Sequence, residues 1–375
     1  MAVTFHSIPN GYSPSDNPLK YEFSSNQTAQ PNFSYIVEIN LNGAVIFQSR
    51  IFPEVGIYAH YDASDIVKYR IPKPTMGTAL SQDNGTLQDL SLTVTENYGT
   101  PAINVGTTTS TVTRTWKAGL SDEDFITKDF DTDYVTKKFL TNVPRGTNIQ
   151  MTRGQDVYLE MIDDSGAVSS FFNFYDSDGI LLETLSQNNT FGIWQLNMKD
   201  SILDALLTVS IADVAYFTVK IGLFCETLTY EYFDDYCNYP FSLMWMNEYG
   251  AKDSYVFKHN NELKASVKES SYRSQFGKWV GNSFVYSVTD SGQIDYVKQI
   301  KQSGTITTDY ITEEFQNYLV EIFDSPFYLL YDINGYSIAI VVNASSYSFD
   351  QSRFDELLML EVKYDKASSK RSLTL

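Results

Sequence analysis

The alternation of hydrophobic and polar residues between Phe33 and Ile51 predicts a β-hairpin. Every second residue from Phe33 to Ile39 is hydrophobic, which is the period of a strand with one buried face. Asn42 and Gly43 follow, and an Asn-Gly pair favours a two-residue turn in which both central residues have positive φ. Hydrophobic positions then resume up to Ile51. We therefore expect two antiparallel strands joined by a tight turn.

The same strand pattern recurs along the chain and favours a mainly β fold. A second hairpin is predicted over residues 169–185, with Ser177, Asp178 and Gly179 as its turn. Further strands are expected at Leu90–Asn97, Thr111–Lys117, Gln155–Ile162, Tyr216–Phe224 and Tyr255–Phe257. Their spacing, with turn residues between them, is typical of immunoglobulin-like β-sandwiches and not of alternating strand–helix units.

One later segment has the period of an amphipathic helix. Hydrophobic residues recur at three- and four-residue intervals between residues 307 and 326, which predicts a helix over about 309–324. Thr308 or Thr312 is expected to cap its start, and Pro326 to end it. Strand patterns return at 327–331, 336–342 and 357–364, and a short helix is expected at 200–207. The C-terminal part is therefore predicted to be α+β.

The hydrophobic pattern is interrupted near residues 229–240, where we expect a domain boundary. We predict an extended N-terminal arm over residues 1–30, a β-sandwich region over 31–230 and a smaller α+β domain over 231–375. A further split of the sandwich region near 141–146 stays open. The chain has no repeat of fixed period, so a solenoid or a propeller is not expected.

Aromatic residues are the main compositional excess, since 27 Tyr, 24 Phe and 4 Trp make up 15% of the 375 residues. Such residues suit half-buried strands and the centres of protein interfaces. A hydrophobic content of 43% excludes a chain that is disordered over most of its length. The 27 Lys and Arg face 46 Asp and Glu, a formal net charge of −19. Binding of nucleic acid needs a cationic surface, so sequence-specific DNA binding is not expected.

The sequence has no signature of secretion or membrane insertion. Its first residues lack the basic and apolar segments of a signal peptide, and no apolar run approaches the length of a membrane span. Cys225 and Cys237 are too few for a disulfide framework and match no zinc or redox spacing. We expect a protein made in the cytoplasm, with free thiols and no membrane partner.

No set of residues predicts catalysis, a cofactor or a metal site. His6, His60 and His259 are the only histidines, and none has a nearby cluster with ligand spacing. Asp176 begins a sequence similar to a calcium loop, but Gln187 stands where that loop needs a glutamate. Phosphate-binding, dinucleotide, zinc-protease and serine-hydrolase motifs are absent. A glycosidase pair cannot be chosen among 46 carboxylates. The sequence therefore predicts a protein that is not an enzyme.

Three stretches carry a resemblance to a known group of proteins. They are Asn17–Tyr35 followed by Asp62–Val67, then Phe139–Arg145, and finally Leu243–Tyr255, which contains Trp-x-Asn-x-x-Gly-x-x-Asp-Ser-Tyr. Together they resemble virion structural proteins of crAss-like bacteriophages that infect Bacteroidetes, especially the ring proteins stacked below the portal in the short tail. The resemblance spans most of the chain. It implies β-sandwich domains assembled into a ring in the tail or head-to-tail connector.

The last of these stretches also has a direct physical interpretation. Gly250 and Asp253, with the Ser that follows, supply turn residues between strands expected at 241–246 and 255–258. Trp245 is expected to anchor a core, Asn247 to stabilise the turn, and Tyr255 to open the second strand. We predict that these residues form a structural motif and do not contact a ligand.

These expectations combine into a structural function in a virion. A ring of identical subunits repeats one interface until it closes, and edge strands or the N-terminal arm can pair across subunits by strand addition. Neighbouring tail or portal proteins are the other expected partners. An acidic lumen would repel DNA and let it slide during ejection. A glycan-binding β-sandwich adhesion module of a virion or bacterial surface is the alternative, and a polysaccharide-degrading tail enzyme is a third hypothesis.

Overall fold

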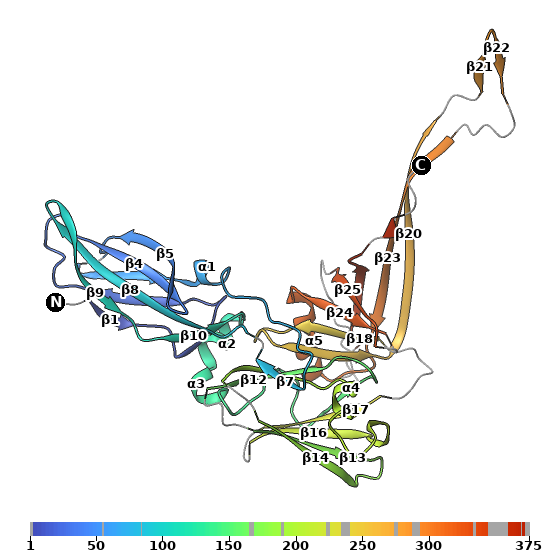
Figure 1. The fold of residues 1–375 in the computed structure, drawn as a ribbon, viewed down its shortest axis with the longest axis horizontal. Coiled ribbons are helices and arrows are strands. Elements are labelled where there is room, and N and C mark those ends of the chain that lie inside the picture. The colour runs from blue at the N-terminus through green and yellow to red at the C-terminus, as the bar shows by residue number, and fades with distance from the viewer. Residues whose placement is uncertain are drawn as a thin grey trace. The chain divides into compact units, whose positions relative to one another are not determined.

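The chain is mainly β, as the sequence predicts (Figure 1). The computed structural model describes residues 3–54, 56–83, 85–164, 169–188, 191–222, 226–233, 241–273, 277–286, 293–332, 335–343, 359–368 and 370–371. Contacts divide the chain into two compact units. The first unit combines Met1–Phe233 with Trp245–Ser254, and the second unit combines Asp234–Met244 with Tyr255–Leu375.

Two sheets of the first unit contain the N-terminal strands. One sheet has the order β1 (Thr4–Ser7), β3 (Lys20–Ser24) and β6 (Tyr58–Asp62). The other has the order β2 (Tyr12–Pro14), β10 (Thr113–Trp116), β8 (Gln88–Gly99), β4 (Ser34–Leu41) and β5 (Ala44–Ile51), with β9 (Ala102–Thr109) paired with β8. The short helix α1 (Ser64–Val67) follows β6.

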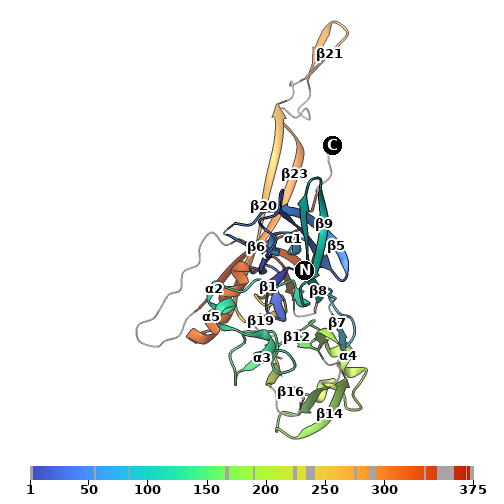
Figure 2. The same cartoon turned by 90° about the vertical axis from the view of Figure 1, so that its left-hand side faces the viewer.

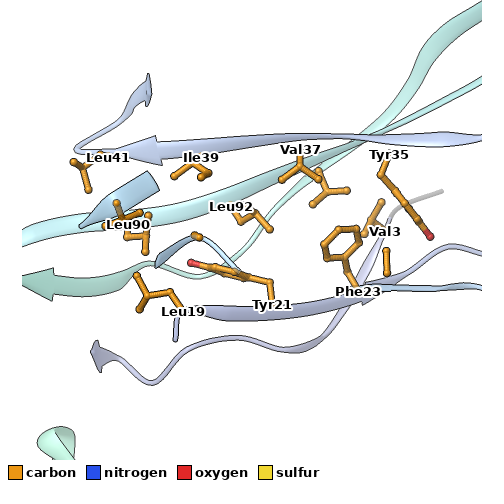
Figure 3. Packing of buried hydrophobic residues seen from close by; sticks show 14 of the residues in the cluster. Val3, Leu19, Tyr21, Phe23, Tyr35, Val37, Ile39, Leu41, Leu90 and Leu92 are labelled. Atoms are coloured by element: carbon orange, nitrogen blue, oxygen red, sulfur yellow. The ribbon is translucent and has the colours of Figure 1, made fainter. Parts of the chain in front are cut away.

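The hydrophobic core of this region lies between the two sheets, which therefore form a β-sandwich (Figure 3). Tyr21 and Phe23 of β3 face Val37 of β4 and Leu92 of β8, and all four are buried. The alternation predicted for residues 33–51 places Tyr35, Val37 and Ile39 on the buried face of β4, whereas Val45 and Phe47 of β5 are exposed. Asn42 and Gly43 have φ values of 49° and 77°, so the predicted Asn-Gly turn between β4 and β5 is confirmed.

Two further sheets complete the first unit. One has the order β11 (Asn148–Met151), β17 (Thr227–Tyr232), β16 (Tyr216–Ile221), β13 (Ser169–Tyr175) and β14 (Leu181–Asn188). The other has the order β12 (Tyr158–Asp163), β15 (Gly192–Asn197) and β7 (Ser81–Asp83). Short helical segments lie between strands: α2 (Asp122–Thr127), α3 (Phe130–Asp133), α4 (Asp200–Asp204) and the 3-10 turn η1 (Ile211–Asp213).

The second unit contains one large sheet and the longest helix among the described residues. The sheet order is β19 (Lys252–Phe257), β18 (Phe241–Met246), β24 (Tyr328–Tyr331), β25 (Ser337–Val342), β26 (Glu361–Lys366), β23 (Gln293–Thr307) and β20 (His259–Arg273), with β27 (Lys370–Arg371) paired with β23. A separate hairpin consists of β21 (Lys278–Val280) and β22 (Ser283–Val285). The helix is α5 (Glu313–Asp324).

Strands β20 and β23 run side by side and extend beyond the rest of their sheet (Figures 1 and 2). Their pairing runs from His259 opposite Thr307 to Arg273 opposite Gln293. We call these two strands the ribbon, and β21 with β22 the tip hairpin. The ribbon is absent from the sequence prediction because the alternation of apolar and polar residues in β20 is confined to residues 262–267, with mostly polar residues on either side.

Three boundaries differ from the sequence prediction. Residues 3–30 are not an extended arm, because β1 and β3 pair with each other and bury Val3 and Tyr21 in the sandwich core. Residues 245–254 belong to the first unit although the sequence places them in the second domain. Helix α5 starts at Glu313 and not near residue 309, because Thr308 still exchanges hydrogen bonds with Leu360 beside β26.

Several other predicted elements are present. Gly179 has a φ of 78° in the turn between β13 and β14. Thr312 caps α5, since its side chain accepts a hydrogen bond from the backbone of Phe315. The short helix expected at 200–207 is present as α4. Part of the strand predicted at 357–364 and the Asn334 half of the expected Asn-Gly turn lie outside the described residues.

Candidate functional site

The predicted motif forms the connection between β18 and β19, and Asn247 bridges this connection by hydrogen bonds. The backbone N–H of Asn247 donates to the carbonyl of Ala251 at 2.9 Å, and its side-chain oxygen accepts from the N–H of Ala251 at 3.0 Å. Gly250 donates to the carbonyl of Asn247 at 3.0 Å. Asn247 therefore has the turn-stabilising position that the sequence suggests.

Gly250 is required by both its conformation and its surroundings. Its φ is +75°, a value that side-chain-bearing residues seldom adopt. A Cβ atom built on Gly250 would lie 1.7 Å from the carbonyl oxygen of Lys117. The connection thus passes directly against the backbone that follows β10, where only a glycine fits.

Tyr249 inserts the connection into an aromatic cluster of the first unit. Its ring is fully buried and lies with centroid distances of 6.1 Å to Phe130 and 5.5 Å to Tyr134. The indole Nε1 of Trp116 donates to the carbonyl oxygen of Tyr249 at 2.8 Å. These contacts hold residues 245–254 in the first unit. Strand β18 ends within this segment and strand β19 begins within it, and both strands belong to the large sheet described above.

Asp253 is buried and joins two of the stretches that carry the resemblance. Its carboxylate accepts from the Thr141 hydroxyl at 2.7 Å and from the side-chain amide of Asn247 at 2.8 Å. Burial raises the pKa of Asp253 to about 6; the two hydrogen bonds and Arg145 act in the opposite direction, and Glu160 acts in the same one. Asp253 is thus a buried carboxyl group whose oxygens accept hydrogen bonds from Thr141 and Asn247.

The pH dependence of stability is expected to change in the Asp253→Asn variant. Because the folded-state pKa lies above the usual 3.8, folding favours the protonated form of Asp253. The protonated Asp253 carboxyl therefore adds roughly 3 kcal/mol to the free energy of unfolding below about pH 4, and this stabilisation is lost as the pH rises to about 6. Denaturant unfolding at several pH values should show this loss in the original protein and not in the variant. Parallel pH profiles would contradict the assignment.

Lys252 and Glu160 form a buried ion pair beside the motif. Lys252 Nζ lies 2.9 Å from a Glu160 carboxylate oxygen, and the two side chains are 4% and 0% exposed. Lys252 also donates to the carbonyl of Thr75 at 3.1 Å, and Gln195 donates to Glu160 at 2.8 Å. This network fastens the irregular segment around Thr75 to β12, β15 and β19, and the sequence pattern did not indicate it.

Trp245 and Tyr255 lie at the two ends of the motif, in different units. Trp245 is fully buried, in agreement with its expected place in a core. Tyr255 belongs to the second unit and makes edge contacts with the rings of Phe257 at 5.2 Å and Phe315 at 6.2 Å. Asn247 and Gly250 lie at the turn, and Asn247 also bonds Asp253. Asp253 itself belongs to β19 and not to the turn, because β19 begins at Lys252, so the prediction that Tyr255 opens this strand is wrong.

The remaining polar candidates have local partners. His6 lies 2.7 Å from the Ser24 hydroxyl, and His60 lies 3.1 Å from a Glu54 carboxylate oxygen. Asp176 accepts hydrogen bonds from the backbone N–H groups of Asp178 and Ile180, which is the hairpin-turn role considered for it. Cys225 and Cys237 lie outside the described residues. Among the residues that the structure describes, no group of three or more His, Cys, Asp or Glu side chains is arranged to hold a metal ion.

A shallow depression lies on the sheet that contains β1, β3 and β6. Its volume is about 310 Å³, and it is lined by Ser7, Lys20, Tyr21, Glu22, His60, Tyr61 and Asp62. Lys20, Glu22, His60 and Asp62 give the depression a charged lining, whereas Tyr21 is buried in the sandwich core and Tyr61 is half-buried against it. Such a lining suits a polar ligand with apolar faces better than an apolar one.

Two exposed apolar surfaces lie on the second unit. On the ribbon, Leu263 and Val267 are 60% and 51% exposed. On the tip hairpin, Trp279, Val280, Phe284 and Val285 are between 40% and 67% exposed. None of the described helices is long and apolar enough to cross a bilayer. Exposed apolar side chains also occur on the first unit, for example Val45, Phe52 and Ile103, and apolar surfaces of this kind are candidates for contact with another molecule.

The fold therefore places the chain among mainly β proteins with a β-sandwich. No protein-family model matches the sequence, and no curated protein matches it. The chain is similar to one in the crystal structure of Dpr2 Ig1-Ig2 in complex with DIP-Theta Ig1-Ig3, with 6% sequence identity and a TM-score of 0.22. That alignment covers 100% of this chain and 96% of the other. A TM-score this low supports no argument about function.

Proposed function

We propose that the chain is a structural protein of a bacteriophage virion and assembles with copies of itself into a ring in the tail or head-to-tail connector. The main support is the ribbon, whose two strands have 15 residues each, together with its tip hairpin. Exposed apolar side chains lie on β20, at Leu263 and Val267, and on the tip hairpin. An exposed apolar extension of this kind buries little within its own chain and suits contacts between subunits. The resemblance of three stretches to ring proteins supports the same function.

The charge of the chain agrees with a channel that lets DNA pass. A protein with a formal net charge of −19 repels phosphate groups, unless cations gather on one face. DNA would then slide along the ring during ejection without binding to it. Portal and tail proteins above and below the ring are the other proposed partners.

Electron microscopy and mass measurement of the purified full chain test this function. Closed rings of uniform mass are expected, and antibody labelling of intact particles should place the chain at the tail or connector. A chain that stays monomeric at high concentration, or is absent from purified particles, would exclude the proposed function.

A glycan-binding adhesion module is the second candidate, and the depression beside Tyr61 and His60 is the observation that favours it. The half-buried Tyr61 ring and the charged groups around it can contact an apolar face and hydroxyl groups of a sugar. Saturable binding of host polysaccharide by a monomer, lost in the Tyr61→Ala variant, would favour this candidate over the ring.

A further inference from the structure

The ribbon is built in a way that favours contact with a second molecule. At about 3.3 Å per residue, each of its 15-residue strands spans about 50 Å. Strand β26 pairs with β23 only at residues 303–307, and β27 only at residues 299 and 300. Over residues 268–273 and 293–298, the described pairing of each strand is with the other strand alone. A two-stranded segment is marginally stable in water, so contact with a partner would stabilise it.

The two faces of the ribbon near the sheet differ in chemistry. Leu263, Ala265 and Val267 share one face, and Ile300 lies opposite Val267 on β23. The other face carries Glu262, Lys264 and Ser266, and Lys264 forms an ion pair with Glu262 at 2.6 Å. An apolar stripe opposite a charged face is the pattern of a strand pair that lies along a protein surface.

The tip hairpin is apolar on both of its faces. Trp279 lies opposite Phe284 across the strand pair, with a ring-centroid distance of 5.4 Å. Val285, on the other face, lies opposite Lys278. Exposed Trp and Phe side chains at the end of a long extension have the features of anchors that fill a pocket on a partner.

The distribution of charge favours a second copy of the chain as the partner. Residues 259–307 contain six Lys or Arg and four Asp or Glu, a net charge of +2. The whole chain carries −19, so the rest of the chain carries −21. A weakly basic, apolar extension on a strongly acidic protein complements the surface of its own siblings.

We propose that the ribbon and its tip hairpin bind the acidic first unit of a neighbouring copy. This inference rests on the proposed function, because it names the contact that joins subunits of the ring. The segment from Ser121 to Asp133 is where we expect the tip hairpin to bind. It carries six carboxylates and one lysine, and Ile126 within it is 82% exposed.

The test combines variants with crosslinking of the full chain. Trp279→Ser with Phe284→Ser removes the anchors of the tip hairpin, and Lys278→Glu reverses its charge. Self-association is measured by mass photometry and sedimentation, with circular dichroism as a check on folding. The anchor variant should raise the dissociation constant on the order of 30-fold or more. The matched control is Tyr336→Ala, an aromatic that is 71% exposed in the same unit, and it should change the constant by about twofold or less.

A photoreactive amino acid at position 279 identifies the surface that the tip hairpin touches. Crosslinks to the first unit of another copy, concentrated in residues 121–133, are expected. Intact rings formed by the anchor variant would overturn the inference and leave the proposed function standing. A wild-type chain that never self-associates would overturn both. Flotation with phosphatidylcholine–phosphatidylglycerol vesicles that depends on Trp279, without crosslinks between copies, would assign the tip hairpin to a membrane surface and also overturn it.

Discussion

The Gly250→Ala variant is expected to lose more than about 4 kcal/mol of stability and to fold poorly. The added Cβ would lie 1.7 Å from the Lys117 carbonyl oxygen, a separation far inside van der Waals contact. Relief of that clash requires the connection between β18 and β19 to leave its position, which would expose Tyr249. The measurements are soluble yield and denaturant unfolding, followed through the fluorescence of the buried tryptophans.

A matched variant separates this clash from backbone strain. Gly43 has a φ of +77°, almost the same as Gly250, but no atom lies within 4 Å of the position of its Cβ. Gly43→Ala is therefore expected to cost only about 1–2 kcal/mol, the usual cost of a left-handed alanine. Equal losses in the two variants would show that Gly250 matters for its φ alone and would contradict the close approach to Lys117.

The Lys252→Met variant is expected to lose about 3–5 kcal/mol, because it leaves the Glu160 carboxylate buried without its cation. Lys252 Nζ also donates to the Thr75 carbonyl, so the segment around Thr75 should become more open to hydrogen exchange. Denaturant unfolding gives the first quantity, and exchange measured by mass spectrometry gives the second.

Two controls test whether the loss of stability in Lys252→Met comes from the buried carboxylate that it leaves without a cation. The exposed pair of Lys363 and Glu361 has a similar distance of 3.0 Å, but its side chains are 68% and 52% exposed. Lys363→Met should change the free energy of unfolding by less than about 1 kcal/mol. The double variant Lys252→Met with Glu160→Gln should lose less stability than Lys252→Met alone, because the uncompensated charge is gone. Additive losses would contradict coupling between the two side chains.

Local sequence signals predicted the elements that depend on neighbouring residues. The Asn42-Gly43 turn follows from the φ values that those two residues tolerate, and the end of α5 follows from the proline after it. The alternation in β4 and β8 is clear because one face is buried and the other is solvated. In β20, residues 262–267 are exposed on both faces, and their alternation is too short to predict a strand of 15 residues.

The aromatic excess shows how composition alone can mislead. The sequence suggests interfaces as one destination for these residues, but most of the largest fully buried side chains, including Phe172, Phe217 and Tyr364, are aromatic and fill the cores of single units. Ten aromatic side chains of the described residues remain exposed, among them Trp279 of the tip hairpin. Burial depends on which strands meet across a core, and composition does not contain that information.

The sequence by itself determined the mainly β character, the two hairpin turns and the turn chemistry of Asn247 and Gly250, because these follow from backbone preferences and periodicity within a few residues. Only the tertiary structure decided that residues 245–254 join the first unit, that Lys252 meets Glu160, and that Asp253 meets Thr141. These partners are 92 and 112 positions apart. Their attraction depends on burial and distance, which are set when distant strands assemble and not by any local pattern.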